Sequence, residues 1–500
     1  MRSESELGPQ ALPVQRPAGL AEDAGPRAVS AARPRLGVLV LLSLAILLVA
    51  LGQFYFLRRP AYFWDALTFS VLGILAFVAA GIRSERVRLG GAQGDRASAW
   101  SELVPPYTLA PWRLGVLVIA VGFSLLALRL LSIEPTLPSY VRATLYWLAS
   151  IGAFILAAAP PRRRPRTDLS IWWEVNRRIV FVLAAIVLVA LALRVWRLDT
   201  IPPVLGGDEG SFGLESVRVL KGELRNPFIT GWLSNPTMGM FFNAPSIRLF
   251  GNTSFGLRIP WALVGTATIL MVFWLVTRLK GLTLGLMTAV LLATYHYHIH
   301  FSRLGINNAS DPLFAAMALL FLYRAYDRRS PLDWALCGVV SGAAQYFYFG
   351  ARSIPIIVAL LTLSFIVRDG RRFWREQYSG ILILAGAFLI TAAPMIQFAI
   401  RHPAEYNARL AQVGVLGAWL ENEQVVRGQG AFTIMLDQFK RAVLAFNAFP
   451  DRTTWYGSPQ PLFDATAGAL FLLGLGYSTL RLDDRRLFPM AVWWWVPMIL

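Results

Sequence analysis

Residues 37–57 read GVLVLLSLAILLVALGQFYFL, an unbroken apolar run without a single charged side chain. A helix of about 20 apolar residues crosses the hydrocarbon core of a bilayer, because each residue advances it by about 1.5 Å. The run is therefore long enough to span a membrane. It does not alternate between polar and apolar residues, as the strands of a membrane barrel do.

Similar runs recur along the whole chain of 500 residues, of which 56% are hydrophobic and 15% charged. Soluble proteins average about 25% charged residues. We therefore predict an all-α, polytopic transmembrane helical bundle with interfacial helices in its outer loops. The expected spans, about 13, lie near residues 37–57, 62–82, 114–133, 139–159, 179–197, 259–277, 281–301, 312–326, 334–350, 354–367, 379–400, 461–479 and 487–500.

The distribution of basic residues predicts how the chain lies in the membrane. Its net charge of +18 comes mostly from arginine, and the arginines gather in short loops. With the N-terminus inside, the short inner loops hold 23 Lys and Arg residues and the short outer loops hold 5. Cytoplasmic loops carry such an excess. We expect an integral, multi-pass plasma-membrane protein with a cytoplasmic N-terminus and no nucleic-acid partner.

Composition also divides the chain into parts. Residues 1–36 lack apolar periodicity and are expected to form a disordered cytoplasmic tail. An N-terminal module of four spans follows at 37–160, and a basic cytoplasmic linker at 161–178. The core is expected at 179–500, and its last run reaches the end of the sequence, which suggests truncation at the C-terminus.

Two adjacent carboxylates stand out in the first long outer loop, within the stretch GGDEGSFG at Gly206–Gly213. Asp208 and Glu209 would lie at headgroup depth, where a carboxylate can serve as a general base. Alternatively, Asp208 caps the helix expected at 210–220, and Glu209 favours its dipole. The residues alone leave both readings open. A second interfacial helix is expected at 238–250.

A second polar cluster, HYHIHFSRLGINNASDPLF, follows the run at 281–301. His296 and His300 would share a helix face, a weak half-site for a metal that is more often a pair of interfacial histidines. Asp311 before Pro312 is typical of a helix start. Arg303 could extend toward the interface or bind a phosphate.

Two further outer segments carry candidates for substrate binding. Arg352 lies beside Tyr348 in a short outer hairpin, although most arginines of the chain lie in the inner loops. A guanidinium at this position suits an anionic headgroup. The second long outer loop, 401–460, contributes aromatic and basic side chains that could line a sugar or lipid cavity, although for any single one of them ordinary loop packing is the favoured interpretation: Tyr406, Arg409, Trp455 and Tyr456.

This ordered set of motifs resembles the GT-C fold membrane glycosyltransferases, in the branch of the protein O-mannosyltransferases and the lipid A aminoarabinose transferase (glycosyltransferase family 39-like). The acidic pair matches the signature of that branch, and Gly251–Pro260 matches the motif before its second core span. Asp311–Pro312 stands where the family has a second aspartate, and Tyr348–Arg352 resembles a Tyr-x-x-x-Arg motif. The resemblance covers about 179–500 and leaves out the first four spans.

One stretch departs from the family pattern. Family members often carry a basic residue before two prolines in the first loop, which helps to bind the lipid phosphate. The corresponding residues here, Ser234–Thr237, read SNPT and hold no base. That leaves the phosphate contact to Arg303 or Arg352.

The resemblance implies transfer of a hexose or pentose from a polyprenyl-phosphate carrier to a hydroxyl of a lipid, glycan or protein acceptor. It implies a single, inverting displacement on the outer face, without a metal or other cofactor. Asp208 would be the base, and Glu209 and Asp311 would orient it or the acceptor. The expected substrate-binding residues are Arg303, Arg352, Tyr348, Asn307, Tyr406 and Arg409.

Two other function classes remain open at this point. A transporter or lipid flippase would also be polytopic, but it places ionisable residues near the bilayer midplane. The candidate charges here cluster at the outer ends of spans instead. A polysaccharide polymerase or ligase uses a large outer loop with arginines, yet it needs no acidic pair after the first core span.

Overall fold

The computed structural model describes residues 36–89, 110–133, 136–159, 169–451 and 456–499. These residues form helices joined by turns, with no strand among them and one isolated bridge, between Thr230 and Pro236. The all-α, polytopic class predicted from the sequence is therefore confirmed.

Every apolar segment expected as a span contains helix, but the number of 13 spans is not confirmed. Eight helices in the described part of the chain are long and apolar enough to cross a membrane. A ninth span is possible if α9 and α10, bent by 62° at their junction, count as one. The helices that contain the eight are α1 (Leu36–Arg58), α2 (Phe63–Leu89), α3 (Pro111–Ser132), α4 (Leu137–Ala158), α5 (Leu169–Val195), α8 (Ser254–Lys280), α13 (Ser353–Asp369) and α14 (Arg371–Arg401).

The other apolar helices are shorter or more charged. Helix α12 has 14 residues, below the roughly 20 that a bilayer requires. Helix α11 carries Asp311 in its first turn and Arg328 in its last. The remaining bounds are α9 (Leu282–Thr294), α10 (His296–Ser302), α11 (Ser310–Arg328), α12 (Pro331–Ala344), α18 (Ala465–Leu480) and α19 (Phe488–Ile499).

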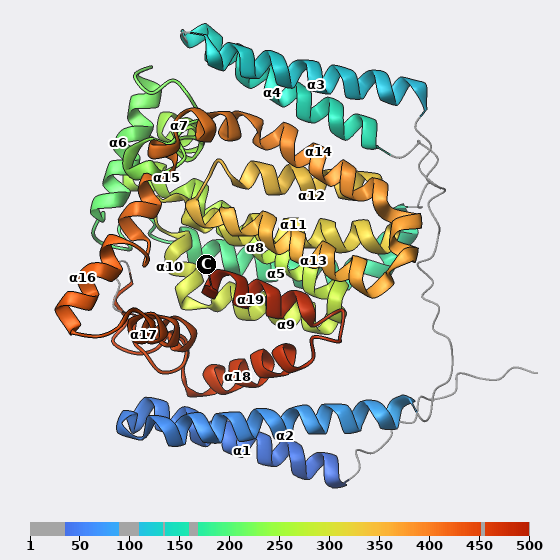
Figure 1. Ribbon diagram of the computed structural model, residues 1–500, viewed down its shortest axis with the longest axis vertical. Helices are drawn as coiled ribbons and strands as arrows, with labels where there is room; N and C mark the ends of the chain where they lie inside the picture. The colour runs from blue at the N-terminus through green and yellow to red at the C-terminus, as the bar shows by residue number, and fades with distance from the viewer. Residues whose placement is uncertain (1–35, 90–109, 134–135, 160–168, 452–455, 500) are drawn as a thin grey trace, which may run out of the picture.

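The four N-terminal spans form two separate hairpins. Helices α1 and α2 pack together and against α18, whereas α3 and α4 pack against α12 and α14. In Figure 1 the two hairpins lie at opposite sides of the core. Close packing within the first hairpin depends on glycine, because a Cβ at Gly73 would lie 2.5 Å from the Val49 side chain. The division into domains stays a prediction.

The largest apolar core lies among α11, α12, α13 and α14, closed by α8 and α19. Trp334, Leu361 and Phe365 are buried there. Helices α12 and α14 approach closely at Gly338, where a Cβ would meet the Leu384 carbonyl oxygen at 2.3 Å. This core fixes the helix ends that carry the polar clusters.

Charged loops meet at one end of the bundle. Arg278 pairs with Asp327, and Lys280 with Asp484. Arg485 pairs with Asp369. All of these residues belong to loops predicted to be cytoplasmic or to the helix ends beside them, so the structure brings that set together. Which end faces the cytoplasm stays a prediction.

The opposite end holds the helices of the two long loops. Helices α6 (Gly207–Leu220) and α7 (Met238–Phe250) confirm the two helices expected in the first loop. The second loop forms α15 (Pro403–Val413), α16 (Ala418–Arg427) and α17 (Ala431–Leu444). The 3₁₀ turns are η1 (Pro60–Tyr62), η2 (Trp232–Ser234), η3 (Asn307–Ala309) and η4 (Phe349–Arg352).

Candidate active site

The acidic pair lies in the first turn of α6, and its two carboxylates face different surroundings. Gly206 occupies the N-cap position of the helix, with no side-chain capping bond. The alternative reading of Asp208 as the cap is therefore wrong. Glu209 is fully buried, whereas Asp208 is only partly buried.

Glu209 is held by a buried ion pair. Its Oε1 accepts from Arg258 Nε at 2.6 Å and its Oε2 from the same guanidinium at 3.0 Å. The Gly305 amide also donates to Oε1, at 2.7 Å. Arg258 donates further to the carbonyls of Leu198 and Pro202. This arrangement joins α6 to α8 and to the turn after α10. Glu209 is fully buried and lines neither of the two cavities described below.

Asp208 lines a polar cavity of about 260 Å³. Arg409 on α15 lines the same cavity, and neither side chain hydrogen-bonds or ion-pairs with any described residue. Opposite charges that share a cavity without touching leave space for a polar group between them. The other lining residues are Phe212, Trp232, Asn235, Tyr297, Phe301, Ile306, Asn307, Asn308 and Tyr348.

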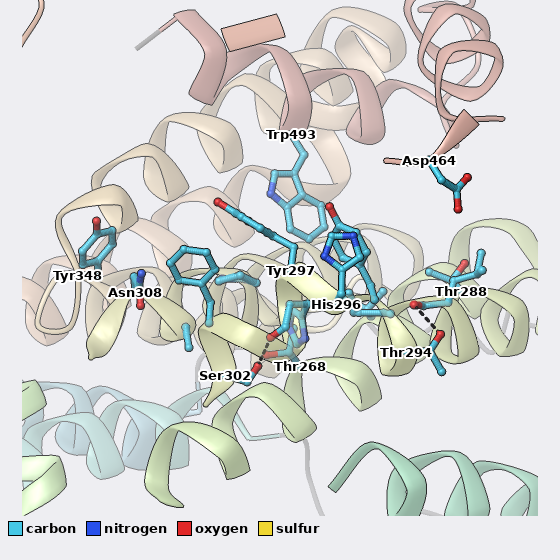
Figure 2. Close-up of a pocket in the computed structure, with 18 residues that line it drawn as sticks. Thr268, Thr288, Thr294, His296, Tyr297, Ser302, Asn308, Tyr348, Asp464 and Trp493 are labelled. Atoms are coloured by element: carbon cyan, nitrogen blue, oxygen red, sulfur yellow. Dashed lines mark hydrogen bonds between the residues drawn. The ribbon is translucent and has the colours of Figure 1, made fainter. Parts of the chain in front are cut away.

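A larger groove of about 820 Å³ adjoins this cavity. Its walls come from α8, α9, α10, α11 and α19, and they are mostly apolar. In Figure 2, Tyr348 and Asn308 lie at one end of the groove, and Thr288 and Thr294 toward the other. The groove and the polar cavity are adjacent, because they share four lining residues: Tyr297, Phe301, Asn308 and Tyr348.

Asp311 lies beside this junction, in the first turn of α11. Its Oδ1 is buried without a hydrogen-bond partner, as is the Oδ1 of Asn308. Its Oδ2 lies against Gly350, where a Cβ would approach to 2.4 Å. The charges of Asp311, Arg409 and Asp208 all act on the Tyr348 hydroxyl. The structure thus brings together the three predicted segments that carry Asp208, Asp311 and Tyr348.

Arg303 contacts protein carbonyls and lines neither cavity. Its guanidinium donates to four carbonyl oxygens at the end of α5 and in the turn beyond it, those of Leu193, Trp196, Arg197 and Ile201. Burial, and then the nearby charge of Arg258, lowers the pKa of Arg303. This geometry favours an anchoring role, and the predicted phosphate contact has no support in it.

Arg352 and Tyr406 contact each other and likewise line neither cavity. Arg352 donates to the Tyr406 carbonyl at 2.8 Å, and its guanidinium lies 3.8 Å from the centre of the Tyr406 ring. The second face of the guanidinium covers Phe349, at 4.2 Å. This stack joins η4 to α15, the helix that carries Arg409. Asn307 lines the polar cavity and donates to the Phe347 carbonyl.

The two histidines of the possible metal half-site have other partners. His296 Nε2 lies 3.1 Å from the Leu462 carbonyl, and its Nδ1 contacts the Tyr456 hydroxyl. The His300 ring packs edge-on against Tyr456. No three His, Cys, Asp or Glu residues are grouped for a metal in the described ranges. Metal independence stays a prediction. Trp455, expected in the second long loop, lies outside the described residues.

Sequence reasoning missed one buried polar cluster. Arg194 on α5 donates to the carbonyls of Leu292 and Ala293 at the end of α9, and to His298 Nδ1 at 2.7 Å. It thereby satisfies carbonyls that the α9–α10 bend leaves open. The available signal was an arginine inside an expected span, since such residues are rare there.

The sequence model of one protein family, described as dolichyl-phosphate-mannose-protein mannosyltransferase, matches residues 234–398. No curated protein matches the chain. The family match confirms the resemblance to GT-C membrane glycosyltransferases. Within that class, the matched residues carry a fold like that of glycosyltransferase family 39. They include the residues shared by the two cavities, whereas Asp208 and Arg409 lie outside them.

Proposed function

We propose that the protein transfers a sugar from a polyprenyl-phosphate carrier to an acceptor hydroxyl on the outer face of the membrane. The observation that carries this proposal is that the apolar groove adjoins the polar cavity lined by Asp208 and Arg409 and shares four lining residues with it. The groove suits a prenyl chain, and the cavity suits a sugar and its phosphate.

Asp208 is the proposed general base, because it is the unpaired carboxylate of the cavity. It accepts the proton of the acceptor hydroxyl as the hydroxyl oxygen bonds to the anomeric carbon. The bond between that carbon and the phosphate oxygen breaks in the same step, and its electron pair leaves with the lipid phosphate. A single displacement inverts the anomeric configuration.

Arg409 is the proposed partner of the leaving phosphate. Arg409 lines the cavity and forms no ion pair with a described carboxylate, so its charge is available to an anion. Stabilisation of developing charge by a fixed cation is worth several kcal/mol of barrier in enzymes. Arg303 and Arg352 have positioning roles in this proposal. Arg303 anchors the turn that follows α5, and Arg352 holds α15 in place.

Sugar hydroxyls would be bound at the junction of the two cavities. Asn308 Oδ1, on the shared lining, is a buried acceptor without a partner among the described residues, which is costly unless a ligand supplies a donor. Asp311 Oδ1 is a second such atom; Asp311 lines neither cavity itself but precedes Pro312, which lines the groove. The Tyr348 hydroxyl adds a donor and acceptor on the same side. The sugar itself and the class of acceptor are not specified by these three groups.

The test is transfer from a radiolabelled polyprenyl-phosphate sugar by the purified full chain, with wild type compared with Asp208→Asn. We expect the variant to lose about 10²–10⁴-fold in rate, the usual contribution of a general base. Glu215→Gln, on the same helix in a surface ion pair with Arg218, is the control and should transfer normally. Undiminished transfer by Asp208→Asn would exclude it as the base.

A further inference from the structure

A second polar cavity, of about 450 Å³, lies apart from Asp208. It opens between the α3–α4 hairpin and the junction of α14 with α15, and the loop before η2 completes its wall. Its polar lining residues are Ser132, Tyr140, Asn226, Gln397, Arg401, His402 and Glu405. None of these residues has a role in the proposed transfer step.

Hydrogen bonds between the elements hold the cavity walls in place. Gln397 Nε2 donates to Ser132 Oγ at 2.9 Å and to the Leu128 carbonyl at 3.1 Å, which joins α14 to α3. The Tyr140 side chain of α4 lies beside that of Asn226. Thr230 Oγ1 donates to the Glu405 carbonyl. The cavity is therefore built by three segments that are distant in sequence.

The charge of the lining favours a neutral ligand. Arg401 is the one arginine in the lining, and it pairs with no described residue. Glu405 opposes it with one carboxylate, 3.3 Å from His402 Nδ1. An anionic headgroup would require an excess of positive charge, which these residues do not provide.

The remaining lining combines hydrogen-bonding groups with apolar surface. Amide, hydroxyl, guanidinium and carboxylate groups supply both donors and acceptors. Phe228, Ile229 and Phe398 supply the apolar part. A sugar ring presents the matching pattern, with hydroxyl groups around its rim and C–H groups on its faces.

Helix α15 connects this cavity to the polar cavity of the candidate active site. Glu405 lines the first and Arg409 the second, and residues four apart lie on one helix face, about 6 Å along the axis. The loop after α6 also serves both, through Asn226 and Asn235. This distance along the helix axis between Glu405 and Arg409 is close to the length of one sugar unit.

We propose that the second cavity is a saccharide-binding site that holds the non-reacting part of a carbohydrate acceptor. Its role as an acceptor site rests on the proposed function, but saccharide binding itself does not. The α3–α4 hairpin, outside the matched family segment, then has a purpose: it forms one wall of the site.

The test is ligand-detected NMR (saturation transfer) on the full chain in phosphatidylcholine nanodiscs, with trisaccharides of glucose, mannose, galactose and N-acetylglucosamine as probes. We expect at least one trisaccharide to bind the wild type. Arg401→Gln and Glu405→Gln should each weaken binding about tenfold, because each removes a charged hydrogen-bonding group. Ser132→Trp should abolish it by filling the cavity from an exposed position.

Two controls separate the possible results. Arg248→Gln, at an exposed arginine on α7, should bind as the wild type does. Asp208→Asn should also retain binding, because Asp208 lines the other cavity. In transfer assays, Arg401→Gln should raise KM for an oligosaccharide acceptor and leave kcat unchanged.

Three results overturn the proposal: no trisaccharide binds, binding is unchanged in both Arg401→Gln and Glu405→Gln, or phosphatidylglycerol in the nanodiscs displaces the probe. The last result would identify an anionic headgroup site. If trisaccharides bind but no polyprenyl-phosphate sugar supports transfer, the proposed function fails while the saccharide site stands. The two proposals therefore fail separately.

Discussion

Adjacent residues of like chemistry take different roles in this protein. Glu209 is buried against Arg258, and Asp208, one position earlier, faces an open cavity. A helix turns about 100° per residue, so neighbours in one turn point in different directions. The same distinction applies to the arginines, since Arg303 contacts carbonyls and Arg409 contacts the cavity.

Glu209→Gln should destabilise the protein by about 3–5 kcal/mol, because it leaves the buried Arg258 charge without a partner. Thermal unfolding in detergent measures this. The double variant Glu209→Gln, Arg258→Gln should recover part of the loss. A stable Glu209→Gln protein that has lost transfer would instead assign Glu209 a direct part in catalysis.

Arg409→Gln should lower kcat by about 10²–10³-fold, since it removes the proposed stabiliser of the leaving phosphate. Its stability should match the wild type, because no described residue pairs with Arg409. Arg303→Gln should show the reverse, with a lower unfolding temperature from the carbonyls left unpaired. Single-turnover transfer and thermal unfolding, measured on both variants, decide between the two arginines.

At the scale of elements, short helix contacts place the site. The η4 turn and α15 are joined through Arg352 and Tyr406, and this contact sets where Arg409 lies. The α9–α10 bend, held by Arg194, places Tyr297 and Phe301 where groove and cavity meet. Broken helices of this kind expose backbone groups that must be satisfied within the protein.

Gly338→Leu should separate α12 from α14, because even a Cβ there would meet the Leu384 carbonyl at 2.3 Å. Overpacking of this kind lowers the free energy of unfolding by about 1–3 kcal/mol or more. Gly122→Ala, on α3 with no neighbour within 4 Å of its Cβ position, is the matched control. Equal unfolding temperatures for the two variants would contradict the close contact between the helices.

At the scale of the molecule, polar chemistry and basic loops occupy opposite ends of the bundle. The cavities lie at the end with α6 and α15, and the ion pairs of the short loops lie at the other. Such a division suits an enzyme that acts at one membrane surface while its basic loops hold the orientation.

Cysteine accessibility tests the predicted orientation. The single native cysteine, Cys337, is buried and should not react. A membrane-impermeant maleimide should label Val425→Cys, on exposed α16, in intact cells. It should label Arg372→Cys, at the basic end of α14, only after permeabilisation. The inverse pattern would place the candidate active site in the cytoplasm.

The sequence predicted more of the helices than of the contacts. The helices expected at 210–220 and 238–250 were inferred from apolar periodicity and glycine positions, which are local signals, and the structure has them at 207–220 and 238–250. The predicted number of 13 spans was not confirmed. Helix α12, for example, is apolar but only 14 residues long. Arg303 was expected at a phosphate, because residue type cannot say which carbonyls will surround a side chain.

The sequence by itself determined the class of the protein, because apolar length and loop charge set how a chain lies in a bilayer. It also identified the acidic pair and the ordered motifs of the glycosyltransferase resemblance. Only the tertiary structure decided which carboxylate is anchored and which faces the cavity. It also brought Asp208 of the first loop to one cavity with Arg409 of the second. The reason is physical: such contacts depend on helix packing between distant segments, and no local pattern encodes it.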